Sequence, residues 1–111
     1  MLDINVTTAK DTTVVAITGE IDGSTAPKAG EQILALVQPG GKIILDLSKV
    51  SYMSSAGLRM LLLTYRTVNG KGGRVALVGL STELEDTMSM TGFLDFFDHF
   101  DTLDAGIAHL A

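Results

Sequence analysis

The hydrophobic and polar positions along this chain follow two alternating periods. Residues 2–8 alternate between apolar and polar side chains, residues 13–18 form a mostly β-branched run, and the segment AKDT lies between the two. A period of two is typical of β-strands, and a short polar connection between two such runs is typical of a hairpin. The pattern therefore predicts an antiparallel pair of strands at the N-terminus, with the first strand partly exposed and the second buried.

Three more strands are predicted further along the chain. Residues 42–47 and 74–78 are continuous apolar runs, the pattern of strands that are covered on both faces of a sheet. We therefore expect both to be central and parallel. Residues 96–100 form a weaker run, for which we expect a strand at the edge of the sheet.

Helical spacing, with apolar residues three and four positions apart, recurs between and after these strands. Ser24 and Asp101 are the expected N-caps of the first and fourth helices, and the third helix is expected to begin after Ser81 and to stop at Gly92. The second helix has the clearest apolar stripe, over residues 58–68, and Gly70 is expected to end it. The segments follow one another in the order ββαβαβαβα.

This order predicts the fold class. Alternating strands and helices favour an α/β domain with a mixed, mostly parallel sheet, helices packed on it and a functional edge at the carboxyl ends of the strands. A chain of 111 residues is the usual size of one domain, so we expect residues 1–111 to form a single domain. The pattern leaves the order of the strands within the sheet open.

Composition and charge indicate which class of molecule this protein binds. The 13 acidic residues outnumber the 8 basic ones and give a net charge of -5, which argues against nucleic acid and anionic membranes as partners and favours another protein. The chain has no cysteine, so we expect neither disulfides nor a zinc–thiolate site. Its start lacks a secretory leader pattern, and no apolar run is long enough to span a membrane. We therefore expect a cytoplasmic protein.

Two adjacent serines, Ser54 and Ser55, open the second helix and are followed by Ala56 and Gly57. One hydroxyl is enough to cap a helix, and we assign that role to Ser54. The hydroxyl of Ser55 would then point outward from the helix N-terminus, where unpaired amides and the helix dipole favour an added negative group. The small residues that follow would leave room for a large partner to approach. The pattern predicts a site for a phosphoryl group.

Other kinds of site fit the sequence less well. A serine hydrolase needs a histidine beside its nucleophile, but the two histidines, His99 and His109, fall in the last predicted strand and helix, and the serines do not follow a G-x-S-x-G pattern. Aspartates at intervals of three over residues 95–104 do not match a calcium loop. The glycine-rich segment 70–73 precedes a strand rather than a helix, which favours a turn over a phosphate loop. We expect no catalytic residue, metal or cofactor.

Residues 46–58, DLSKVSYMSSAGL, resemble the signature of STAS domains of the anti-sigma factor antagonist type, which reads D-L-S-x-V-x-[FY]-[MIL]-[DS]-S-[ST/A]-G-L. Residues 19–22, GEID, are similar to the G-E-L-D that follows the second strand in that family, and the predicted element order is the STAS order. The resemblance implies a binding protein rather than an enzyme, phosphorylated by a serine kinase that is itself the anti-sigma factor or switch component. The matching acceptor is Ser55, with Ser54 as the alternative. Many family members have Asp where Ser54 stands and Ser where Ala56 stands.

The resemblance also implies a cycle of partners. The unphosphorylated protein would bind the anti-sigma serine kinase and release a sigma factor for a transcriptional stress response, and a PP2C-type phosphatase would restore that form. The expected partner-binding residues are Asp22, Ser24, Met53, Ser54, Ser55, Gly57 and Arg59. The alternative is a constitutive STAS subunit of a larger complex, such as a lipid-transport or stressosome-like assembly, in which Ser55 serves only as a cap.

Overall fold

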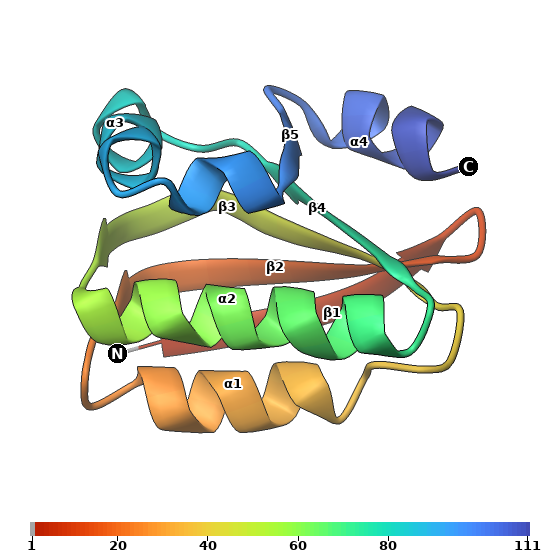
Figure 1. Cartoon of the computed structure of the whole chain (residues 1–111), viewed down its shortest axis with the longest axis horizontal. Helices are drawn as coiled ribbons and strands as arrows, with labels where there is room; N and C mark the ends of the chain where they lie inside the picture. The colour runs from red at the N-terminus through yellow and green to blue at the C-terminus, as the bar shows by residue number, and fades with distance from the viewer. Residues whose placement is uncertain (1) are drawn as a thin grey trace.

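The computed structural model describes residues 2–111, in which five strands form one sheet flanked by helices (Figure 1). The elements follow the predicted order ββαβαβαβα, with one additional 3-10 helix, η1. None of the helices in this described range is long and apolar enough to cross a membrane. The elements are β1 (Leu2–Ala9), β2 (Thr12–Ile21), α1 (Ala26–Leu34), β3 (Lys42–Met53), α2 (Ser55–Gly70), β4 (Arg74–Val78), α3 (Thr82–Met90), η1 (Phe93–Phe96), β5 (Asp98–Phe100) and α4 (Leu103–Leu110).

The strands lie side by side in their sequence order, β1-β2-β3-β4-β5. β1 pairs with β2 in an antiparallel hairpin, and every other pair is parallel, as predicted. Lys10 and Asp11 form the hairpin turn with φ values of 48° and 64°, the left-handed backbone of a two-residue type I′ turn. The edge strand β5 is shorter than the predicted run 96–100 because the chain up to Phe96 coils into η1 before it pairs with β4.

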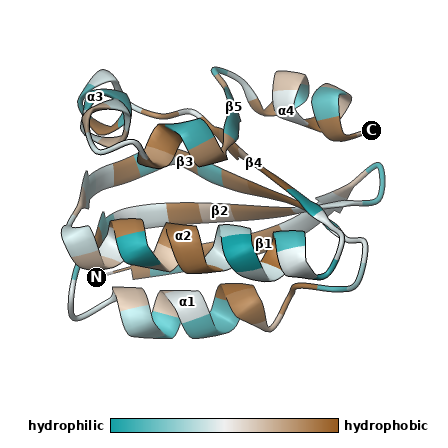
Figure 2. Cartoon of the chain, viewed as in Figure 1, coloured by the Kyte–Doolittle hydropathy of each residue, from teal (hydrophilic) through white to brown (hydrophobic). Residues whose placement is uncertain are grey.

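The two faces of the sheet carry separate apolar clusters. On the face covered by α1 and α2, Ile43 and Leu45 of β3 belong to the larger cluster. Ile44 points to the opposite face and packs in a smaller cluster with Leu110 of α4. Figure 2 shows hydrophobic residues along β4 and on the sheet-facing helices α1 and α2. The burial of alternate residues on both faces confirms that β3 is a central strand.

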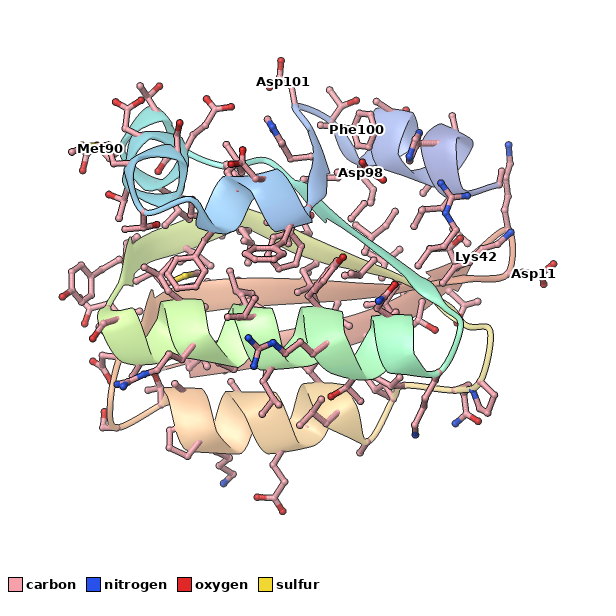
Figure 3. The ribbon with its side chains drawn as sticks, viewed as in Figure 1. Asp11, Lys42, Met90, Asp98, Phe100 and Asp101 are labelled. Atoms are coloured by element: carbon pink, nitrogen blue, oxygen red, sulfur yellow. The ribbon has the colours of Figure 1, made fainter. Side chains whose placement is uncertain are left out.

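The predictions for two of the helix caps are wrong by one residue. α1 begins at Ala26 with Thr25 at the N-cap position, and the Ser24 hydroxyl instead donates to the carboxylate of Asp22 at 2.7 Å. α4 begins after Thr102, whose hydroxyl accepts the Ala105 amide at 3.2 Å. Asp101 lies one residue earlier, in the bend that follows β5, where Figure 3 shows it pointing away from the sheet.

The predictions for α3 are correct. Ser81 lies at its N-cap and accepts the Leu84 amide at 3.1 Å, which satisfies one amide of the first turn. The helix ends at Met90, and Gly92 follows with φ of 80°, a backbone that glycine adopts without steric cost. Leu84 and Met88 pack into the larger apolar cluster, so α3 contributes to the same core as α1 and α2.

Candidate functional site

The N-terminus of α2 lies at the carboxyl edge of the parallel strands. β2 ends at Ile21 and β3 ends at Met53, and these two residues pair across the sheet. The chain then turns at Ser54, whose amide donates to the Ile21 carbonyl at 2.8 Å. Since residues 22–25 connect β2 to α1 at the same edge, the first turns of α1 and α2 open toward the same side of the molecule (Figure 1).

Gly57 allows the first turn of α2 to pack directly on the strand ends. A Cβ atom at this position would lie 2.5 Å from the Met53 Cγ and 2.9 Å from the Ile21 Cγ2, closer than such atoms approach in proteins. Gly57 and Met53 are both buried. Both were expected on a partner-binding surface, but the structure places them below the exposed first turn of α2, where they hold that turn against the strand ends.

The two serines occupy different environments. Ser55 is the first residue of α2 and is exposed. Ser54 is at the N-cap position with extended backbone, but its hydroxyl is buried and has no hydrogen-bond partner within residues 2–111. The prediction that Ser54 caps the helix through its side chain is therefore wrong. Its backbone holds the turn instead, through the bond to Ile21 and through its carbonyl, which accepts the Leu58 amide at 3.0 Å.

The first turn of α2 is suited to receive an anion. The amides of Ser55 and Ala56 have no acceptor in the described part of the chain, and the first turn contains no acidic residue. α2 is 16 residues long, so its dipole places a partial positive charge at this end. A phosphoryl group on the Ser55 hydroxyl would lie where these amides and the dipole stabilise negative charge.

The loop between β2 and α1 is held by the carboxylate of Asp22. Its Oδ1 accepts the Ser24 hydroxyl at 2.7 Å, the Ser24 amide at 2.9 Å and the Thr25 amide at 3.1 Å. These hydrogen bonds, that of the Ser24 hydroxyl above all, hold the pKa of Asp22 below its usual value. Thr25 completes the loop, because its hydroxyl accepts the Asp22 amide and donates to the Glu20 carbonyl, both at 2.9 Å.

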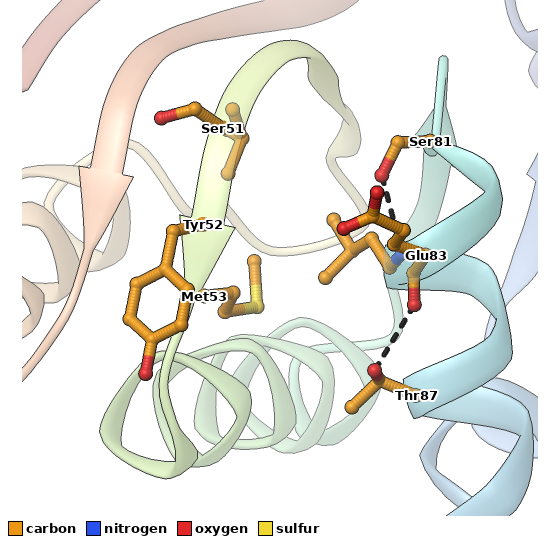
Figure 4. Close-up of a pocket in the computed structure, with 8 residues that line it drawn as sticks. Ser51, Tyr52, Met53, Ser81, Glu83 and Thr87 are labelled. Atoms are coloured by element: carbon orange, nitrogen blue, oxygen red, sulfur yellow. Dashed lines mark hydrogen bonds between the residues drawn. The ribbon is translucent and has the colours of Figure 1, made fainter.

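A small cavity of about 190 Å³ lies between the end of β3 and the start of α3 (Figure 4). Tyr52 and Met53 line it from β3, and Glu83 and Thr87 line it from α3. The Thr87 hydroxyl donates to the backbone carbonyl of Glu83 at 3.0 Å, and Glu83 is exposed. A volume of this size is enough for one side chain.

Neither histidine lies beside the serines. His99 contacts Glu85 at 3.6 Å, and His109 lies 3.0 Å from Asp98 and 3.1 Å from Arg74. These pairs are at the β5 side of the sheet, on α3, β4, β5 and α4. Within residues 2–111, no group of three or more His, Asp or Glu side chains is placed to hold a metal ion.

The structure brings the predicted site residues to one edge of the sheet, but at different depths. Asp22, Ser24, Ser55 and Arg59 lie at exposed or half-buried positions, while Met53 and Gly57 are buried. Two residues at this edge were not predicted: Ile21, whose carbonyl anchors Ser54, and Thr25, whose hydroxyl joins both ends of the loop. For Thr25 a signal was present, since Asp followed three residues later by Thr is typical of side chain–backbone turns.

Comparisons with known proteins agree with this architecture. The model of the STAS domain family matches residues 3–106. An anti-sigma-B factor antagonist of Bacillus subtilis is 37% identical over 84 residues, covering 76% of this chain and 77% of that protein. The crystal structure of an anti-sigma factor antagonist from Mycobacterium paratuberculosis superposes with a TM-score of 0.89 at 28% identity, covering 99% of this chain and 94% of the other. The phosphorylated form of the Bacillus cell fate determinant SpoIIAA shares the fold, with a TM-score of 0.74 at 20% identity, covering 98% of this chain and 100% of the other.

Proposed function

The chain belongs to the STAS domain family, and on that premise we propose that it acts as an anti-sigma factor antagonist switched by phosphorylation of Ser55. Unphosphorylated, it binds an anti-sigma serine kinase in the cytoplasm and so releases a sigma factor. Phosphorylation ends that contact, and a PP2C-type phosphatase restores it. The observation that carries the proposal is the exposed Ser55 hydroxyl at a helix N-terminus whose first amides have no acceptor within residues 2–111.

The chemistry of phosphate explains how one site can switch binding without unfolding the protein. A phosphoserine carries a charge of about -1.5 to -2 and three acceptor oxygens. In the free protein, the amides of Ser55 and Ala56 and the dipole of α2 stabilise that charge. In the complex, the same charge would be removed from water against the kinase, at a large free-energy cost. Phosphorylation therefore weakens binding far more than it changes folding.

The proposed contact surface consists of the first turn of α2 and the loop between β2 and α1. Ser55 and Arg59 contribute from α2, and Ser24 with the Asp22 carboxylate contributes from the loop. Because several hydrogen bonds hold Asp22, this loop loses little conformational freedom on binding. Met53, Ser54 and Gly57 support the surface from below.

Incubation with the cognate kinase and ATP, followed by mass spectrometry, tests the assignment of the acceptor. We expect one phosphate per chain, on Ser55, and none on the Ser55→Ala variant. A label on Ser54, or full labelling of Ser55→Ala, would reject Ser55 as the acceptor. If neither serine is labelled and the protein remains in a stable complex in cells, the constitutive-subunit alternative replaces the switch.

A further inference from the structure

An apolar groove of about 480 Å³ runs between α1 and α2 on the outside of the molecule. Gly30 of α1 and Met60 of α2 form its floor, and a Cβ atom on Gly30 would lie only 3.0 Å from the Met60 Cγ. Leu34 and Leu63 line the walls, and Leu63 is 52% exposed although it is a large apolar side chain. Exposed apolar surface in a recess is typical of a site that another molecule covers.

The groove is continuous with the proposed contact surface. α1 and α2 lie side by side and run in the same direction, with their N-termini at the same edge of the sheet (Figure 1). Pro27 and Ala56, both in first turns, line one end of the groove, and Ala56 follows Ser55 directly. A partner bound over Ser55 would therefore reach this groove.

The groove also contains two charged side chains. Arg59 and Glu31 line its two sides, and neither forms an ion pair with any residue in the range 2–111. A covering molecule that presented an acidic group to Arg59 would gain a charge-assisted hydrogen bond in a partly desolvated position. A second copy of this chain fits poorly because two molecules of net charge -5 repel each other.

We propose that the groove receives one amphipathic helix of the anti-sigma kinase, with apolar side chains directed at Leu34, Met60 and Leu63 and an acidic residue opposite Arg59. This inference rests on the proposed function. Two neighbouring helices offer the groove into which a third helix packs its side-chain ridges. α1 has nine residues, so the groove is about 13 Å long and accommodates about two turns of the incoming helix.

The test measures affinity by calorimetry with the purified kinase, first identified by its retention on the Ser55→Ala protein. Leu63→Glu places a charge in the groove, and Leu63→Ala removes apolar area without adding charge. Met90→Glu is the matched control, because Met90 is a helical apolar residue that is 88% exposed and points outward from the end of α3 (Figure 3). Circular dichroism and thermal unfolding show whether each variant retains its fold.

We expect Leu63→Glu to weaken binding about tenfold or more, Leu63→Ala to weaken it less, and Met90→Glu to leave it within about twofold. Arg59→Glu should also weaken binding, and reversing the facing acidic residue of the kinase to lysine should restore it.

If Ser55→Asp weakens binding but Leu63→Glu, correctly folded, does not, the groove inference is wrong and the proposed function stands. If neither weakens binding, both fail. A concentration-dependent dimer that Leu63→Glu disrupts, with kinase affinity unchanged, would assign the groove to a second copy and overturn the inference.

Discussion

Gly57→Ala tests how the first turn of α2 is held on the sheet. The added Cβ would meet the Met53 Cγ at 2.5 Å, the Ile21 Cγ2 at 2.9 Å and the Ile21 carbonyl oxygen at 3.1 Å. The Met53 Cγ lies near the base of its side chain, and the Ile21 carbonyl is fixed because it accepts the Ser54 amide. Overpacking of this kind costs about 1–3 kcal/mol. Alanine recovers about 1 kcal/mol at most through its higher helix propensity.

The net expectation is a loss of about 1–2 kcal/mol in the free energy of unfolding, measured by urea titration, and a fall in Tm of roughly 4–8 °C for each kcal/mol. Gly70→Ala is the matched control in the same helix, since a Cβ added there would have no atom within 4 Å of it. That variant should be as stable as the original protein or slightly more stable. If Gly57→Ala is as stable as Gly70→Ala, the close approach of α2 to the strand ends is not a constraint, and our explanation of Gly57 is wrong.

Two further predictions concern hydroxyl groups. Ser54→Ala removes a buried hydroxyl without a partner in the described chain, so the free energy of unfolding should stay unchanged or rise by up to about 1 kcal/mol; a loss of that size would show that the hydroxyl caps α2 after all. Ser24→Ala removes the strongest hydrogen bond to Asp22, so NMR titration of the carboxyl carbon should show its pKa rising toward the usual value. Because the folded-state pKa of Asp22 is lowered, the stability that this carboxylate contributes is present above its unfolded-state pKa and is lost as pH falls through its folded-state pKa. Ser24→Ala should reduce this contribution to stability. An unchanged pKa of Asp22 in the variant would contradict this account.

Much of the fold could be predicted because local pattern and tertiary structure agree. The continuous apolar runs of β3 and β4 reflect burial on both faces, and Gly92 ends α3 through its own backbone preference. The caps of α1 and α4 were misplaced because the choice between neighbouring polar residues depends on contacts outside the helix. Ser24 is engaged by Asp22, and Thr102 rather than Asp101 faces the first turn of α4.

The candidate site was predicted in position but not in depth. Ser55 stands out because a second hydroxyl follows the one at the N-cap. The burial of Met53 and Gly57, and the anchoring of Ser54 by Ile21, depend on segments far apart in the sequence meeting at the strand ends, which no local pattern encodes. The groove between α1 and α2 was missed for the same reason.

The most direct test of the central claim is the affinity of the anti-sigma kinase for this protein before and after stoichiometric phosphorylation. Isothermal titration calorimetry would compare the unphosphorylated protein, the protein phosphorylated on Ser55, and Ser55→Ala carried through the same kinase treatment. We predict that phosphorylation raises the Kd about 30-fold or more, equivalent to about 2 kcal/mol, while Ser55→Ala retains the affinity of the unphosphorylated protein. Equal affinity of the phosphorylated and unphosphorylated proteins would contradict the switch.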